Sequence, residues 1–268
     1  MNVTLILLGA GTVGYHLLAQ IAHSPLARLV KHIVICDPAA IREENAITCP
    51  LYRGHVREPK CNRLAALAVR RFADARPRIS TIRRCVEELS WDRVLAPEEP
   101  GRDRVAIILV GLDNWDARLA AMEDLRQHAT AHQDGHDSLV FIQVGLDRGQ
   151  ASIAVLGVDY DDPCPACGKQ VLPEPQPCVL FSPDHRLLRG NLRCEAHAAG
   201  RYVRRIAEDM VLPHRRSVWL NTKTNLVADS GGRAFRQFTR PCRSQVECFG
   251  PHHPGGPLRW ERILSGKA

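Results

Sequence analysis

The sequence predicts an α/β fold in which a doubly wound, mostly parallel sheet carries helices on both faces. Residues 3–8, 32–36 and 105–110 are short runs dominated by apolar residues, and the first runs directly into glycines. Such runs are typical of parallel strands that are buried on both faces. Residues 13–23 and 60–73 instead place apolar residues at helical spacing. Strands that alternate with helices along the chain predict the doubly wound arrangement.

The pattern continues beyond the third strand. A helix is expected from about residue 115, followed by two further strands at 139–144 and 151–156. Two polar segments interrupt the rhythm, at 98–103 and 128–138, and both are expected to be surface loops. The alternation of strands and helices therefore continues to about residue 156.

The character of the chain changes after residue 158. Proline, cysteine and charged residues dominate the next segment, which predicts an extended crossover. A helix at about 196–211 and a hairpin made from 217–221 and 234–239 should follow. We therefore divide the chain into a core, residues 1–158, and a segment, residues 159–268, that completes the same domain.

Composition narrows the class of protein. The formal net charge is +7, but we interpret the basic residues as scattered along the chain. No aromatic residues interleave with them, as a platform for stacking bases would need. Nucleic-acid binding is thus disfavoured. No stretch is long enough to cross a bilayer, and the apolar opening run lacks a basic flank, so a soluble cytoplasmic protein is expected. The ten cysteines are expected to be reduced.

A glycine-rich turn follows the first predicted strand, with Gly9, Gly11 and Gly14 in the spacing GxGxxG. Glycines let the backbone approach a phosphate, and the following helix offers N–H donors at its N-terminus. Asp37 ends the second strand, where its carboxylate can accept hydrogen bonds from ribose hydroxyls. The sheet is therefore expected to be Rossmann-like and to bind a nucleotide, although this fingerprint alone does not distinguish NAD, FAD, S-adenosylmethionine and ATP.

Polar residues farther along the chain favour ATP. Asp113, followed by Asn114, ends the strand 105–110, where a carboxylate can hold Mg²⁺ over the nucleotide. Lys60 begins a helix and could neutralise charge on a polyphosphate. A NAD-dependent Rossmann dehydrogenase needs neither group, and it remains the alternative from another class of enzyme.

Four cysteines form two pairs near the end of the chain. Cys164 and Cys167 have the spacing of half a tetrahedral zinc site, and Cys242 and Cys248 are the natural other half. A nearby imidazole could replace one of the thiolates, from His252 or His253. The alternative is two separate pairs of buried thiols.

Taken together, these motifs resemble the ThiF/MoeB family, whose fold is shared with the adenylation domains of ubiquitin-activating enzymes. The resemblance runs from the first strand to about Cys248. It implies that Asp37 binds ribose, that Asn45 and Lys60 bind phosphates, and that Asp113 and Asn114 belong to the magnesium and nucleotide site. Residues 1–158 are then the nucleotide-binding adenylation core, and the remainder includes a structural zinc knuckle.

The resemblance also implies a reaction and a partner. We expect ATP-dependent adenylation of the C-terminal carboxylate of a ubiquitin-like or sulfur-carrier protein that ends in Gly-Gly, carried out by a homodimer. The family usually has an arginine where Thr48 stands and an asparagine where Met122 stands. Arg53, or an arginine from the other subunit, could cover the first change. These departures keep a second alternative open, a non-catalytic scaffold that binds the partner.

A reactive thiol is the last expectation. Cys194 opens the predicted helix after the crossover, where some members of the resembled family form a covalent thioester or acyl-disulfide link to the partner. A helix N-terminus and the adjacent Arg193 would stabilise the thiolate. Cys178, within the crossover, is the competing nucleophile, and an ordinary thiol at the start of a helix is the other interpretation.

Overall fold

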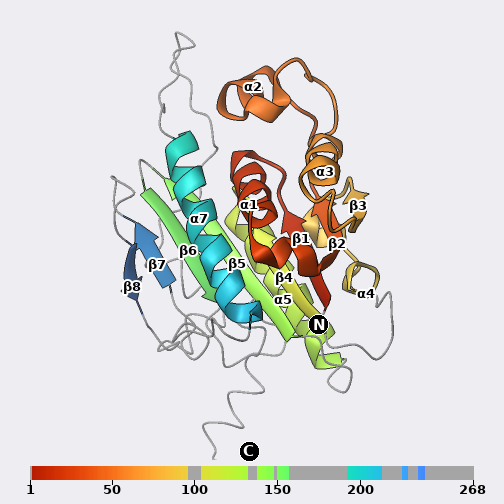
Figure 1. Cartoon of the computed structure of the whole chain (residues 1–268), viewed down its shortest axis with the longest axis vertical. Coiled ribbons are helices and arrows are strands. Elements are labelled where there is room, and N and C mark those ends of the chain that lie inside the picture. Colours follow the sequence, from red (N-terminus) through yellow and green to blue (C-terminus); the bar gives the residue numbers. More distant parts are fainter. Residues whose placement is uncertain are drawn as a thin grey trace, which may run out of the picture.

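The computed structural model describes residues 2–95, 104–131, 138–147, 150–156, 192–212, 225–228 and 235–238. Figure 1 shows them as a single twisted sheet with helices packed on it. The sheet has eight strands in the order β3-β2-β1-β4-β5-β6-β7-β8.

The first five of these strands are parallel, as predicted. They are β1 (Asn2–Leu8), β2 (Val30–Cys36), β3 (Arg78–Ile82), β4 (Arg104–Val110) and β5 (Ser138–Asp147). β1 and β4 lie in unbroken register from Asn2 opposite Arg104 to Leu8 opposite Val110. From Val3 onward every side chain of β1 is buried, which explains its uninterrupted apolar sequence.

The other three strands extend the sheet in antiparallel fashion. They are β6 (Gln150–Leu156), β7 (Asn225–Ala228) and β8 (Phe235–Phe238). β8 matches the second strand of the expected hairpin, but its partner in the sheet is β7. The expected first strand, 217–221, lies outside the described residues. The division of the chain at residue 158 stays a prediction for the same reason.

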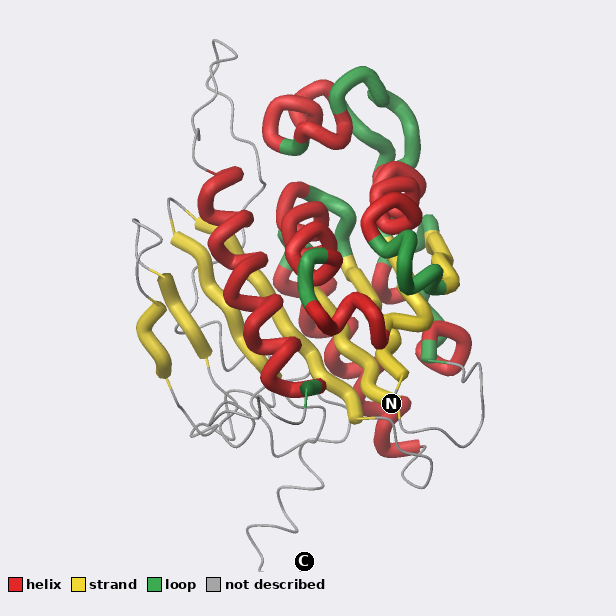
Figure 2. The backbone as a smooth tube through the Cα atoms, in the orientation of Figure 1, coloured by secondary structure: helices red, strands yellow, loops and turns green. Residues whose placement is uncertain are grey.

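Helices cover both faces of the sheet, so the doubly wound arrangement is confirmed (Figure 2). One face packs against α1 (Thr12–Ala22), α3 (Lys60–Arg71) and α7 (Leu192–Val211). The opposite face packs against α4 (Trp91–Val94) and α5 (Trp115–Ala131). Within the described residues, no helix is both long enough and apolar enough to span a membrane.

Two parts of this arrangement differ from the expectation. The edge strand β3 was not predicted, because its half-exposed sequence lacks an apolar run. α5 continues to Ala131, so the segment predicted as a loop from residue 128 begins as helix. Short elements also fill the connections, namely α2 (Glu43–Thr48), η1 (Pro25–Leu29), η2 (Pro50–Tyr52) and η3 (Val86–Glu88).

Candidate functional site

A cavity of about 440 Å³ opens at the carboxyl ends of β1, β2 and β4. Connections leave β1 for one face of the sheet and β4 for the other, which is the position where doubly wound sheets bind ligands. Seven of the predicted site residues line this cavity, namely Gly9, Gly11, Asp37, Asn45, Lys60, Asp113 and Asn114. The volume lies in the range typical of small-molecule sites.

The glycine turn forms the floor of the cavity, and each glycine has a different reason to be there. Gly9 has φ of +94°, and a Cβ on it would lie 2.9 Å from the carbonyl oxygen of Gly111. A Cβ on Gly14 would lie 2.2 Å from the carbonyl oxygen of Gly9, so Gly14 permits close packing and does not itself line the cavity. A Cβ on Gly11 would meet nothing within 4 Å. Gly11 therefore leaves room for a ligand beside the N-terminus of α1.

Asp37 ties the glycine turn to the end of β2. Its Oδ2 accepts a hydrogen bond of 2.7 Å from the backbone N–H of Ala10, and its Oδ1 accepts one of 2.8 Å from Ala39. Each carboxylate oxygen can still accept a second hydrogen bond. The predicted contact with ribose is thus compatible with a structural role that sequence reasoning did not anticipate.

The segment from Ala39 to Lys60 forms a closed loop over one side of the cavity. Its two ends are joined by backbone hydrogen bonds, of 2.8 Å from Ile41 N to Glu58 O and 3.1 Å from Lys60 N to Ala39 O. Inside the loop, the buried Tyr52 donates its hydroxyl to the carbonyl oxygen of Ala10. The start of α3, and with it Lys60, is therefore fixed relative to the glycine turn.

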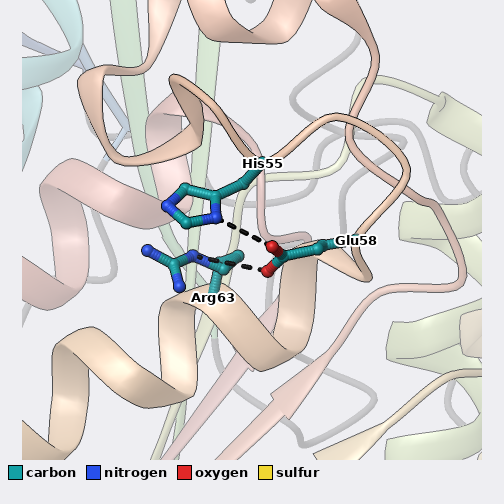
Figure 3. Close-up of polar contacts among 3 residues, drawn as sticks. All are labelled: His55, Glu58 and Arg63. Carbon is teal, nitrogen blue, oxygen red and sulfur yellow. Dashed lines mark hydrogen bonds and ion pairs between the residues drawn. The ribbon is translucent and has the colours of Figure 1, made fainter.

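Three side chains brace the end of this loop against α3 (Figure 3). Glu58 forms a hydrogen bond of 2.8 Å between its Oε1 and His55 Nδ1. Its Oε2 lies 3.7 Å from Arg63 Nε. Pairs of this exposure stabilise a fold only weakly. Their importance lies in position, because Glu58 comes two residues before Lys60.

Arg42 is the cation that sequence reasoning missed. It lines the cavity, and its side chain is 76% exposed, paired only loosely with Glu44 at 3.8 Å. Arg53 is exposed and is not among the lining residues. Asn45 accepts a hydrogen bond of 3.0 Å at Oδ1 from the backbone N–H of Arg42, and its amide nitrogen is a donor that could face a ligand.

Thr48 stands where the resembled family usually has an arginine, and it packs against the start of α1. The side chain is buried and accepts a hydrogen bond of 3.0 Å from the Thr12 hydroxyl. This contact ties α2 to the first residue of α1. Thr48 thus has a local structural role at this position.

Asp113 and Asn114 follow β4 and lead into α5. Asp113 is exposed at the cavity, whereas Asn114 uses Oδ1 to accept from Asp116 N at 2.8 Å and so caps the helix. The buried Arg118 donates through Nε to Leu112 O at 2.8 Å and through Nη2 to Val144 O at 2.8 Å. Arg118 therefore holds the loop that carries Asp113 against β5.

Three free thiols gather near the cavity. Burial, together with the charge of Asp37, raises the pKa of Cys36 to about 12, and burial also raises the pKa of Cys61. Both remain protonated near neutral pH and are poor nucleophiles. Cys85 is exposed and lines the cavity beside Val86, a contribution that was missed because β3 was missed.

The side chains of the predicted nucleophiles and zinc ligands lie outside the described part of the chain. Cys194 is in the first turn of α7, as expected, but its side chain is outside the described part. The proposed zinc ligands Cys164, Cys167, Cys242 and Cys248, and the alternative nucleophile Cys178, lie outside the described residues. Among described residues, no group of three or more His, Cys, Asp or Glu side chains is arranged to hold a metal ion.

Comparisons with known proteins give similarity in structure only. No protein-family model matches the chain, and no curated protein sequence matches it. The structure is similar to crystal structures of E. coli MccB with ATP (15% identity, TM-score 0.59, 88% of this chain and 62% of that one) and with selenomethionine-labelled MccA (17%, 0.60, 92% and 66%). It is also similar to PaaA (14%, 0.50, 89% and 64%). The chain thus spans somewhat less than two thirds of these structures, and identities this low show a shared fold.

Proposed function

We propose that this protein uses ATP to adenylate a carboxylate of a peptide or small protein, in the manner of the ThiF/MoeB family. The observation that carries the proposal is the convergence of Gly11, Asp37, Lys60 and Asp113 on one cavity. Similarity to MccB, whose structures include one with ATP and one with N-formylated MccA, supports it.

The cavity residues fit a bound nucleoside triphosphate. Asp37 would accept from the ribose, and the open space beside Gly11 would admit phosphates to the N-terminus of α1. Lys60 and Arg42 would contribute positive charge, while Asp113 would hold Mg²⁺, which supplies further charge neutralisation. The other charged residues of the lining, Glu44 and Glu87, are acidic, so a triphosphate would need these cations.

In the proposed reaction, a carboxylate oxygen of the partner attacks the α-phosphorus of ATP. The new O–P bond forms as the bond to the β-phosphate oxygen breaks, and pyrophosphate leaves. No proton has to move, so the protein contributes positioning and electrostatic stabilisation. Arg53 was expected to replace the arginine that is usual at position 48 and to contact the triphosphate. We assign this role to the exposed Arg42 instead, because Arg42 lines the cavity.

A binding-only scaffold is the alternative that one observation favours. Thr48 is buried and bonded to Thr12, so no arginine approaches the cavity from that position. A scaffold would bind ATP and its partner without catalysing pyrophosphate exchange.

The test compares two carboxylates that are three residues apart in the sequence, of which only Asp113 lines the cavity. Asp113→Ala should lower magnesium-dependent ATP–pyrophosphate exchange about 100-fold, the scale expected for removing a preorganised charge partner. Asp116→Ala is the matched control, because Asp116 is exposed in the next turn and does not line the cavity. The assay needs a partner, for which a small protein ending in Gly-Gly is the first candidate.

Three outcomes decide the matter. Exchange that is lost in Asp113→Ala and kept in Asp116→Ala supports adenylation. ATP binding without exchange in the parent protein points to the scaffold. Binding of NAD in preference to ATP, measured by calorimetry, contradicts the proposal.

Finer features belong to the same proposal. We expect one structural Zn²⁺ on Cys164, Cys167, Cys242 and Cys248, and elemental analysis that finds no metal would exclude it. A thiol-sensitive adduct with the partner should form at Cys194 and disappear in Cys194→Ala. A homodimer should be visible by light scattering.

A further inference from the structure

The net charge of the chain is concentrated in one segment, contrary to our interpretation of it as scattered. Residues 60–84 contain eight of the 36 basic residues and one of the 29 acidic residues. This segment therefore carries the full formal charge of +7, and the rest of the chain, with 28 of each kind, is neutral. The basic residues are Lys60, Arg63, Arg70, Arg71, Arg76, Arg78, Arg83 and Arg84.

The fold gathers this charge at one edge of the sheet. α3 and β3 lie side by side at the end of the sheet where β3 is the last strand (Figure 1). All of the arginines after Arg63 in this set are exposed. Within the described part of the chain, Arg70, Arg76, Arg83 and Arg84 form no ion pair. We call this surface the basic edge.

The basic edge connects directly with the cavity. Lys60, at the start of α3, lines the cavity, and Cys85, directly after Arg84, lines it as well. The opposite end, with Arg70 and Arg71, is one helix length away, about 16 Å at 1.5 Å per residue. The basic edge thus extends from the C-terminal end of α3 to the cavity.

We propose that the basic edge binds an acidic segment of the polypeptide whose carboxyl group enters the cavity. This inference rests on the proposed function. It adds a property of the substrate that the cavity does not specify, namely a stretch rich in Asp and Glu separate from the carboxyl group that reacts.

Two features favour a polypeptide over a nucleic acid. The single aromatic residue of the segment, Phe72, is 2% exposed, so the basic edge offers no platform on which bases could stack. β3 has no further strand on its outer side within the described residues, which leaves a backbone edge that an extended peptide can pair with. Arginine also suits the recognition of carboxylates, because its guanidinium group can form two parallel hydrogen bonds.

The experiment uses the far end of the basic edge, which does not touch the cavity. The triple variant Arg70→Gln, Arg71→Gln, Arg76→Gln is compared with a control of equal charge change, Arg93→Gln, Arg201→Gln, Arg205→Gln, whose arginines are exposed elsewhere. The probe is a fluorescein-labelled peptide containing ten glutamates, with a glutamine version as its control. Anisotropy gives the dissociation constants, and thermal melts check folding because Arg71 contacts His23 at 3.3 Å.

We expect the triple variant to bind the glutamate peptide about tenfold more weakly than the parent, the sum of three exposed ion pairs. The control variant should bind it within about twofold of the parent, as expected when only long-range screened charge is lost. An equal loss in both variants, or equal binding of the glutamine peptide, would overturn the inference. Tighter binding of a 20-base-pair DNA duplex that is lost in the triple variant would assign the basic edge to nucleic acid and overturn it too.

Calorimetry with ATP separates this result from the proposed function. The triple variant should bind ATP as the parent does. Failure of the parent to bind ATP would contradict the proposed function. A parent that binds ATP but binds the glutamate and glutamine peptides equally well would contradict only the role of the basic edge.

Discussion

The two faces of the sheet are packed in different ways. The face beneath α1, α3 and α7 is covered by a single large apolar cluster. The face beneath α5 is also apolar, with Trp115 and Phe141, but every buried polar residue of the described strands points to it, namely Thr4, His32 and Gln143. α5 itself carries two buried arginines, Arg118 and Arg126.

This difference separates stability from the geometry of the site. The polar contacts of the α5 face include the hydrogen bonds of Arg118 to Leu112 and Val144, which hold the loop that carries Asp113. Buried polar groups contribute little net stability but specify one arrangement when they are satisfied. We therefore expect mutations on the face beneath α1, α3 and α7 to change mainly the free energy of unfolding. Mutations on the α5 face should change ligand binding as well.

The largest change in the free energy of unfolding is expected on the face beneath α1, α3 and α7. Leu64 is fully buried in α3, so Leu64→Ala should lower the free energy of unfolding by about 3 kcal/mol through lost burial and the remaining cavity. Val69, on the same helix, is 61% exposed, and Val69→Ala should change it by less than about 0.5 kcal/mol. Urea denaturation followed by tryptophan fluorescence measures both. A similar loss in the two variants would show that α3 is not anchored as described.

An intermediate effect is expected where the two roles meet. Arg118→Met keeps much of the side-chain volume but leaves the carbonyls of Leu112 and Val144 without this donor, which should cost about 2 kcal/mol. Because the loop with Asp113 is then less well fixed, ATP affinity should fall as well, by about tenfold for a comparable loss of preorganisation.

Arg205→Met, an exposed change on α7, serves as the control for Arg118→Met. It should leave both the urea midpoint and the calorimetric ATP affinity unchanged. A destabilised Arg118→Met with normal ATP affinity would break the proposed division between the faces, since the α5 side would then act on stability alone.

The parts of the fold that could be predicted are those whose signal is local. β1 and β4 are buried on both sides, so their sequences are runs of apolar residues, and the glycine spacing marks the turn between β1 and α1. Asp37 and Asp113 could be found because Asp37 follows β2 directly and Asp113 comes three residues after the end of β4. Their place in one cavity follows from the parallel order of the strands.

Other parts depend on contacts that no local pattern encodes. Arg42 and Tyr52 lie in a loop without periodicity, and only its closure by Ala39 and Lys60 brings them to the cavity. β3 is short and half exposed, which hides it as a strand. Without β3, the basic residues on either side of it could not be recognised as one surface.

The smallest expected effect tests the α5 face most sharply. Gln143 is 1% exposed, and neither its amide nitrogen nor its amide oxygen has a hydrogen-bond partner among the described residues. It stands in β5 beside Val110, the last residue of β4, and next to Val144, which accepts from Arg118. A buried amide without partners costs free energy, so Gln143→Leu, of similar volume, should raise the free energy of unfolding by up to about 1 kcal/mol.

The matched variant is Gln143→Ala, which removes the same amide but leaves a cavity and should therefore be destabilising relative to Gln143→Leu. If Gln143→Leu is more stable and binds ATP as the parent does, the amide serves neither packing nor the nucleotide. If Gln143→Leu is instead destabilised by more than about 1 kcal/mol, this account of Gln143 is contradicted, because the loss of a made hydrogen bond has that sign, as has the misfit of a branched side chain in a packed core. Urea midpoints of the two variants and the parent distinguish these results.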